Sequence, residues 1–542
     1  MDVFEIVIGL LLCGAALAAI ARRIGTPYPA LVAFAGAALA LVPGAPTLVL
    51  DPQLALALFV APVLLDAAFD ASPRDLRANW RSVASLAIGA VALTVVVVAL
   101  VARALVPQMS WAAAIALGAI VAPPDAAAAT AVLRQLRPPN RLLVILEGES
   151  LFNDASALLV YRLAVGATVT GAVSGWRVVP TLIFVTIGSV LLGLVLSRVV
   201  TFVSARVRDV ATAIVVQFCS TFAVWLIAER LHLSGILTMV VFAMAVARLA
   251  PEVIPARIRV PSYAVWDVAV FALNVLAFIL VGFQLKPIVG RLDRATATQY
   301  AWVALAVCAA TILARIAWVS GAAALSRWRC RPRADGTPGP TDAIALSPRA
   351  AAVVAWCGMR GTVTLAAALA LPTAAGGGTP FPQRDIILFT SFAVVVGTLV
   401  LQGVTLRPLI TRLRLRDDGS VEREVQLARV ETLRAALSAA TSSSGEEAAD
   451  LVRRRYELLL RRAEKELASG ETGQPPETDA DLIHAATAAE RRRLSALRTD
   501  GTIGDAAFQR IEQELDLEEL DLEQLLRSGD GAAPAPRRRV SD

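Results

Sequence analysis

The chain has 542 residues, of which 56% are hydrophobic and only 18% charged, and its mean hydropathy is +0.64. Because a soluble domain carries about 25% charged residues, this composition excludes an ordinary globular protein and a disordered chain. The net charge of +6 is uneven: residues 412–542 carry −6 and residues 1–411 carry +12. The basic residues form no patch with interleaved aromatic residues, so the excess does not indicate nucleic-acid binding. The composition predicts a membrane protein with many spans.

Apolar segments follow one another along the first three quarters of the chain. Spanning the ~30 Å hydrocarbon layer takes roughly 20 helical residues. Thirteen candidates lie at approximately 3–21, 29–42, 53–71, 82–105, 111–133, 142–168, 178–203, 211–229, 233–249, 266–285, 300–325, 347–372 and 385–411. We therefore predict an all-α polytopic membrane domain over residues 1–411, with about 13 transmembrane helices, and a helical cytoplasmic tail over residues 412–542.

The basic residues are divided unequally between alternate loops. One set of loops holds 19 Lys and Arg residues, beginning with Arg22 and Arg23, and the other set holds seven. Because cytoplasmic loops are enriched in basic residues, the first set is expected inside, with the N-terminus outside and the C-terminus in the cytoplasm. Only two of the 51 basic residues are lysine, a bias typical of high-GC bacterial genomes. The expected location is therefore a bacterial plasma membrane.

Two of the apolar segments are interrupted in corresponding places. Pro123 and Pro124 break the segment 111–133, and the sequence Cys357–Thr362 breaks the segment 347–372. Thirteen segments divide into six, one and six, and each break falls in the fifth segment of its half. Secondary transporters are commonly built from inverted repeats, with the ion site on such broken helices. The pattern predicts two inverted repeats with two crossing broken helices.

Two aspartates lie deep within the apolar segments. Asp125 is nine residues from Arg134 and Asp154 is thirteen from Arg141, which places them about 13 Å and about 20 Å deep. A charge at such depth costs roughly 2.5–3.5 kcal/mol or more and is functional by default. The alternative role for Asp125 is a cap on a half-helix. The alternative for Asp154 is a purely structural ion pair.

Polar residues surround Asp154 in the sequence. Ser150 and Asp154 are four residues apart and share one helix face, and Glu149 and Asn153 form the neighbouring pair. Hydroxyl, amide and carboxylate oxygens suit a hard monovalent cation. We therefore expect Asp154, Asp125 and Ser150 to bind such a cation, with Asn153 beside them.

Two arginines lie at similar depth, Arg315 in the segment 300–325 and Arg360 in the segment 347–372. A buried arginine must pair with a carboxylate or with the carbonyls of a broken helix. Arg315 is expected either to compensate charge at the ion site or to serve a structural role. Asp66, near the cytoplasmic end of the third segment, is expected either at the membrane interface or lining an inner funnel.

Three motifs in this chain resemble those of the NhaP/NHE-type sodium/proton antiporters, in the monovalent cation:proton antiporter family. The sequence Glu149–Asp154 resembles the family's GES-L-x-ND signature. Gly358–Gly361 resembles its G-x-RG element, and Leu64–Ala67 resembles its LLDA stretch. The order and spacing of the motifs agree with the family over residues 1 to about 411.

The resemblance implies exchange of a monovalent cation for a proton, with sodium first and potassium or lithium as alternatives. It implies that Asp154 is loaded alternately with cation and proton, and that Asn153 occupies the place of a second Asp in electrogenic relatives. It also implies a Glu149–Arg360 ion pair and a homodimer, with no cofactor beyond the transported ions. Because only one acid stands at the Asn153–Asp154 pair, we expect electroneutral exchange of one cation for one proton.

The chain departs from the family pattern at one motif, and two other classes of membrane protein have to be weighed against an antiporter. The family usually has Thr-Asp-Pro at the first crossing, whereas this chain has Pro123-Pro124-Asp125-Ala126, which leaves the ion selectivity open. An intramembrane aspartyl protease using Asp125 and Asp154 is the distant alternative, but both positions lack its usual Gly-x-Gly-Asp context. An open channel is disfavoured, because a buried Asn-Asp pair with balancing arginines favours a relay over a pore. We predict a transporter and not an enzyme.

The tail consists of two helix-prone stretches, 420–468 and 478–528, which are rich in Ala, Leu, Glu and Arg. They are separated by the sequence Ser-Gly-Glu-Thr-Gly-Gln-Pro-Pro. The tail is either a solvated helical pair without a function of its own or a regulatory or dimer-supporting module.

Overall fold

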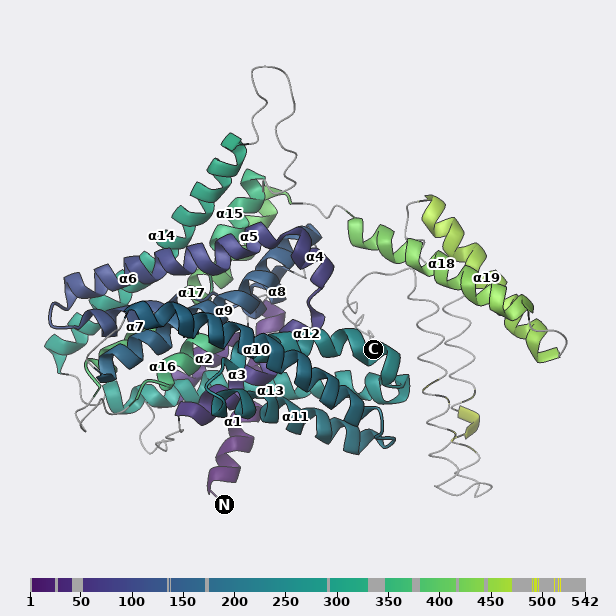
Figure 1. Ribbon diagram of the computed structural model, residues 1–542, viewed down its shortest axis with the longest axis horizontal. Coiled ribbons are helices and arrows are strands. Elements are labelled where there is room, and N and C mark those ends of the chain that lie inside the picture. Colours follow the sequence, from purple (N-terminus) through teal and green to yellow (C-terminus); the bar gives the residue numbers. More distant parts are fainter. Residues whose placement is uncertain are drawn as a thin grey trace. The chain divides into compact units, whose positions relative to one another are not determined.

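The computed structural model describes most of the chain (Figure 1). The described residues are 2–24, 28–40, 52–133, 136, 138–170, 175–289, 293–329, 347–372, 381–415, 419–442 and 447–469, with a few single residues between 490 and 517. Within these ranges the regular structure is entirely helical. The chain divides into two compact units, residues 1–416 and residues 417–542.

Each predicted apolar segment falls on one helix or on consecutive helices of the first unit. These helices are α1 (Asp2–Ile24), α2 (Tyr28–Ala40), α3 (Pro52–Asp70), α4 (Pro73–Ala78), α5 (Trp80–Ala84), the π-helical turn η1 (Ser85–Ala90), α6 (Val91–Leu105), α7 (Trp111–Val121), α8 (Ala126–Leu133), α9 (Asn140–Thr170), α10 (Gly175–Ser204), α11 (Val210–Arg230), α12 (Gly235–Val253), α13 (Ala256–Val289), α14 (Arg294–Arg329), α15 (Pro348–Trp356), α16 (Thr362–Leu369) and α17 (Arg384–Leu413). Six stretches in the described chain are long and apolar enough to cross a membrane: Trp80–Leu105, Ile183–Ser204, Val210–Arg230, Ala256–Ile279, Arg294–Trp328 and Arg384–Leu413.

Side-chain caps mark where several of these helices begin. The Ser110 hydroxyl accepts a hydrogen bond from the Ala113 N–H at 3.1 Å at the start of α7. The Asp209 carboxylate accepts one from the Thr212 N–H at 2.8 Å at the start of α11. Such caps satisfy N–H groups that have no partner within the helix. The hydrogen bonds from Thr212 hold the pKa of Asp209 below its usual range.

The two predicted interruptions are present, and they touch. The helix that begins with α7 stops at Val121 and resumes as α8 at Ala126, because the prolines between them have no N–H to donate. In the other half, residues 357–361 separate α15 from α16. The Asp125 N–H donates to the Met359 carbonyl at 2.7 Å, so the two breaks lie against each other.

The helices of the first unit form two packed groups (Figure 1). The core group comprises η1, α6–α9 and α14–α17; in it α7 packs on both α6 and α9, and α14 packs on α6 and α17. The scaffold group comprises α1–α3 and α10–α13; in it α2 packs on α13, and α12 packs on α3 and α10. The half-helix α16 also contacts α3, so the broken helices lie between the two groups.

A π-helical turn adjoins α9 in the core group. The Ser156 hydroxyl of α9 donates to the Ala87 carbonyl of η1 at 2.6 Å, and the Trp318 indole N–H donates to the Ser85 hydroxyl at 3.3 Å. Single π-turns are frequent at functional sites. Ser156 follows Asp154 by two residues, so the irregular turn lies next to the deepest predicted carboxylate.

Helix α13 begins ten residues before the predicted segment 266–285. Hydrophobicity detects only the apolar part of a helix, whereas Arg257, Arg259 and Tyr263 belong to its polar first turns. The sequence pattern places these charged and aromatic side chains in a loop. The extension of α13 makes them part of the scaffold group.

The second unit contains α18 (Ser420–Ser442) and α19 (Glu447–Ser469), which pack side by side (Figure 1). Arg434 of α18 bonds Glu431 at 2.9 Å and Glu464 of α19 at 2.8 Å, and all three side chains are exposed. Nearly all of the second predicted stretch, 478–528, lies outside the described residues.

Candidate functional site

The candidate site lies where the two interrupted helices meet α9. The Asp125 carboxylate lies directly against Gly361, since a Cβ atom on that glycine would fall 1.6 Å from Asp125 Oδ2. Only glycine at this position lets the carboxylate approach the backbone so closely. Asp125 immediately precedes α8, and Gly361 immediately precedes α16. The carboxylate therefore lies at the positive ends of two half-helices, which stabilise a negative charge.

Arg360 balances the opposite ends of the broken helices. Its side chain is 1% exposed and donates from Nε to the Val121 carbonyl at 2.8 Å and from Nη2 to the Ala122 carbonyl at 3.1 Å. It also donates to the Gly358 carbonyl, and the Arg360 N–H donates to the Thr398 hydroxyl at 3.1 Å. Carbonyls at a helix C-terminus carry partial negative charge. The guanidinium thus compensates the partial negative charge at the C-terminus of α7.

Glu149 pairs with Arg315, so the predicted Glu149–Arg360 ion pair is wrong. Arg315 Nη1 and Nη2 lie 2.5 Å and 2.9 Å from the two carboxylate oxygens of Glu149, and both side chains are 2% exposed. Arg315 Nε also donates to the Val354 carbonyl at 3.2 Å, which ties α9, α14 and α15 together. The physical reason is that Arg360 is engaged by the helix end, whereas the Arg315 fork meets the carboxylate in the bidentate geometry that arginine favours.

Gly358 makes room for both arginines. A Cβ atom there would fall 2.5 Å from Arg315 Cδ and 3.0 Å from Arg360 Nη1. The two glycines of the G-x-RG element thus have separate steric roles, Gly358 toward the arginines and Gly361 toward Asp125.

Asp154 lies on α9 with 4% of its surface exposed, and Asn153 beside it is fully buried. The Asn153 amide nitrogen donates to the Pro124 carbonyl at 3.2 Å, which holds α9 against the first break. Within the described chain, Asn153 Oδ1 has no hydrogen-bond donor and Asp154 forms no ion pair with either arginine. Ser150 lies one turn earlier on the same helix and is half-buried. These buried oxygens can accept a proton or bind a cation.

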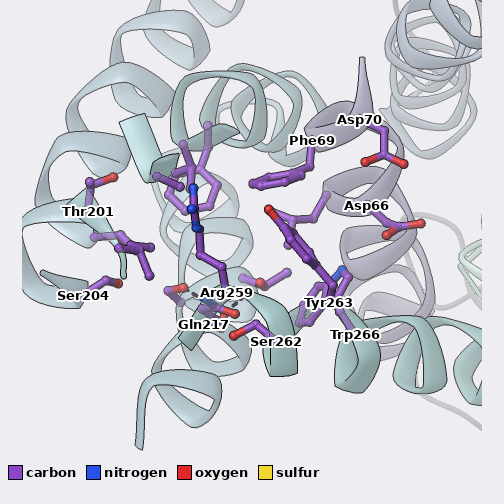
Figure 2. Close-up of a pocket in the computed structure, with 18 of the residues that line it drawn as sticks. Asp66, Phe69, Asp70, Thr201, Ser204, Gln217, Arg259, Ser262, Tyr263 and Trp266 are labelled. Atoms are coloured by element: carbon purple, nitrogen blue, oxygen red, sulfur yellow. Dashed lines mark hydrogen bonds between the residues drawn. The ribbon is translucent and has the colours of Figure 1, made fainter. Parts of the chain in front are cut away.

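The structure brings most of the predicted site residues together and separates one. Asp125, Asn153 and Asp154 lie around the crossing, while Glu149 is held one turn away by Arg315. Asp66 lies instead on α3, where it lines a cavity of about 370 Å³ among scaffold helices (Figure 2). The funnel role expected for Asp66 remains a prediction.

Sequence reasoning missed three contributors. Gly361 was part of a recognised motif, but its contact with Asp125 depends on tertiary structure. Thr398 and Ser156 are single hydroxyls within apolar helices, and no local pattern distinguishes them from residues that bond their own helix. The sequence did not indicate that Glu149 pairs with Arg315 and not with Arg360, since both arginines lie at similar depth.

Known proteins share sequence with this chain over most of its length. The family profile for the sodium/hydrogen exchanger, transmembrane, matches residues 7–412. An uncharacterized Na⁺/H⁺ exchanger of Mycobacterium tuberculosis is 32% identical over 517 residues, covering 92% of each chain. The sodium, potassium, lithium and rubidium/H⁺ antiporter of Bacillus subtilis is 31% identical over 425 residues, covering 76% of this chain and 62% of its own.

A solved structure shares the fold. The sodium proton antiporter MjNhaP1 from Methanocaldococcus jannaschii, at pH 8, matches 76% of this chain and 99% of its own with a TM-score of 0.58 at 17% identity. The family match covers the helices that build the crossing as well as the scaffold group. The chain is therefore a multi-pass membrane protein that belongs to the sodium/hydrogen exchanger family.

Proposed function

We propose that this protein exchanges a monovalent cation for a proton across the membrane, and that Asp154 carries either ion in turn. One observation carries the proposal: Asp154 is buried at the crossing while both nearby arginines are engaged elsewhere, Arg315 by Glu149 and Arg360 by backbone carbonyls. A buried carboxylate needs a compensating charge. With no arginine supplying it, the charge comes from a bound proton or a mobile cation.

The charge balance of the crossing supports a stoichiometry of one to one. Three carboxylates, those of Asp125, Glu149 and Asp154, face two guanidiniums, those of Arg315 and Arg360, which leaves one negative charge. One proton or one monovalent cation neutralises it. The half-helix N-termini beside Asp125 favour its ionised form throughout the cycle, so Asp154 alone changes its load and exchange is electroneutral.

The ligands proposed for the cation are oxygens of Asp154, Asp125 and Ser150, with Asn153 Oδ1 beside them. Sodium is the cation proposed first, and potassium or lithium are the alternatives. The Mycobacterium relative is named for sodium alone, whereas the Bacillus relative is named for sodium, potassium, lithium and rubidium. The missing threonine hydroxyl before Asp125 is consistent with a site of broad selectivity.

The proposed setting is a bacterial plasma membrane, with the N-terminus outside, the C-terminus in the cytoplasm and the protein a homodimer. The excess of basic residues in alternate loops supports this orientation. The two breaks, in corresponding halves and in mutual contact, support thirteen spans arranged as two inverted repeats.

The proposal is tested in proteoliposomes loaded with a pH-sensitive dye. An outward gradient of sodium, potassium or lithium should drive proton uptake into the liposomes. The number of protons exchanged per cation should be the same for each ion that is transported. Impermeant choline in place of the cation is the matched control. Proton movement no faster than with choline for all three ions would overturn the assignment.

The stoichiometry has its own test. Sodium- or lithium-driven exchange is measured with and without an inside-negative potassium–valinomycin potential. Electroneutral exchange predicts equal rates within error. A clear acceleration would show that a second charge moves, and Asp125 would then have to titrate as well.

A further inference from the structure

The cavity lined by Asp66 lies within the scaffold group, and its lining includes none of the residues of the crossing. It measures about 370 Å³, and its described lining comes from α3 and α10–α13 (Figure 2). Asp70 and Ser204 are the last residues of α3 and α10, and Arg259 is the fourth residue of α13. On α11 the polar lining reaches deeper, to Thr221, which is eleven residues beyond Val210 or about 16 Å from the end of the helix. The outer end of the cavity, with Asp70, Ser204 and Arg259, therefore lies at the boundary level of these helices, where lipid headgroups lie in a bilayer.

One side of the cavity carries hydrogen-bond donors that can bind an anion. The Arg259 side chain extends into it and, within the described chain, makes no hydrogen bond or ion pair (Figure 2). Thr201 of α10 is 6% exposed, and its buried hydroxyl has no partner among the described residues. Ser204, one turn on, is also buried. An unengaged guanidinium facing buried hydroxyls suits a phosphate, which accepts charge-assisted hydrogen bonds.

The other side suits a cation. Asp66, Asp70 and Asp267 line the cavity on α3 and α13, together with the rings of Tyr263 and Trp266. Figure 2 shows Asp66 and Asp70 on one flank of the cavity and Thr201 on the opposite flank, with Arg259 between them. Carboxylates beside aromatic faces are the usual surroundings of an ammonium group.

We propose that this cavity binds a zwitterionic phospholipid headgroup, with its phosphate on Arg259 and Thr201 and its ammonium toward the aspartates. A purely anionic headgroup would bring a further negative charge near three carboxylates. A purely cationic ligand would leave the Arg259 guanidinium and the Thr201 hydroxyl unsatisfied. A headgroup that carries both charges satisfies both sides of the cavity.

The walls suit the rest of the lipid. Leu65, Val246 and Ile254 supply apolar lining, and Tyr263 is 50% exposed, so the cavity opens to the surface beside α13. Exposed Val260 and Val268 flank Tyr263 on the same helix, at 67% and 68% exposure. Acyl chains emerging from the opening would cover these valines. This site is independent of the ion-exchange proposal.

The test is lipid retention by the purified full-length protein, measured by native mass spectrometry. The protein is extracted from bilayers containing equal amounts of phosphatidylethanolamine and phosphatidylglycerol with identical acyl chains. We expect wild type to retain phosphatidylethanolamine over phosphatidylglycerol at least about tenfold. Arg259→Gln should lose about tenfold or more of that retention, since a charge-assisted hydrogen bond is removed. Arg259→Lys, which keeps the charge, should restore part of it.

The matched control is Arg257→Gln, which removes an exposed arginine from the same turn of α13 outside the cavity lining. It should retain phosphatidylethanolamine as wild type does. Soluble glycerophosphoethanolamine, added in excess, should compete for the site, which would distinguish headgroup recognition from binding by acyl chains. Equal retention of the two lipids by wild type, or equal losses in Arg259→Gln and Arg257→Gln, would overturn the proposal.

Discussion

Arg315 in the membrane unit and Arg434 in the tail make similar contacts in opposite surroundings. Arg315 bonds Glu149 at 2.5 Å and 2.9 Å with both side chains 2% exposed. Arg434 bonds Glu464 at 2.8 Å with the side chains 53% and 44% exposed. Water can replace either partner in the tail, but nothing replaces a lost partner in the core. Loss of an Arg–Glu ion pair should therefore strongly destabilise the membrane unit and hardly change the stability of the tail.

The largest effect is expected for Arg315→Gln. It strands the buried Glu149 carboxylate and should destabilise the protein by roughly 3–5 kcal/mol. The double variant Glu149→Gln with Arg315→Gln should recover part of the loss, because no buried charge is then unpaired. Thermal unfolding in detergent, followed by tryptophan fluorescence, measures both. Absence of recovery in the double variant would show that the pair does not act as a unit.

Arg360→Gln should have a smaller effect, about 1.5–3 kcal/mol, because the groups left behind are carbonyls with partial charge. Combining it with Glu149→Gln should bring no recovery, since these two residues are not partners. The same unfolding assay applies. A recovery as large as that of the Arg315 double variant would restore the pairing that the structure contradicts.

Gly361→Ala should cost about 1–3 kcal/mol, because its methyl group would occupy the space of the Asp125 carboxylate. Exchange in proteoliposomes should fall with it, since the carboxylate is displaced from the crossing. Gly321→Ala in α14 is the matched control, because a Cβ atom there meets nothing within 4 Å. Indistinguishable exchange rates for the two variants would remove Gly361 from the site.

The smallest effect is expected for Arg434→Gln, within about 1 kcal/mol, because exposed ion pairs contribute little and are screened by salt. Thermal unfolding of the full-length protein, followed by circular dichroism at low and high salt and compared with wild type, measures the effect. A loss of stability as large as that of Arg315→Gln would show that the ion pairs of the two units do not differ in the way proposed.

The all-helical, multi-pass character of the membrane unit could be predicted from sequence, because lipid imposes its length and polarity on every span; the count of thirteen spans and their orientation stay predictions. The two breaks and the deep carboxylates were predictable for the same reason, since prolines and charges are conspicuous in apolar helices. Helix ends were less predictable: α13 extends well beyond its apolar part. The partner of Glu149 was not predictable, because sequence gives the depth of Arg315 and Arg360 but not the direction of their side chains. The π-turn η1 left no recognisable pattern at all.

The role of Asp154 is the central claim, and its most direct test is exchange by Asp154→Asn in proteoliposomes. The amide keeps the size of the side chain but can carry neither a proton nor a balancing charge. Asp209→Asn is the matched control, because it makes the same change at an exposed helix cap where an amide also serves. The account predicts that Asp154→Asn inserts and folds, yet moves protons no faster than empty liposomes, while Asp209→Asn exchanges at the wild-type rate. Exchange by Asp154→Asn at the wild-type rate would contradict it.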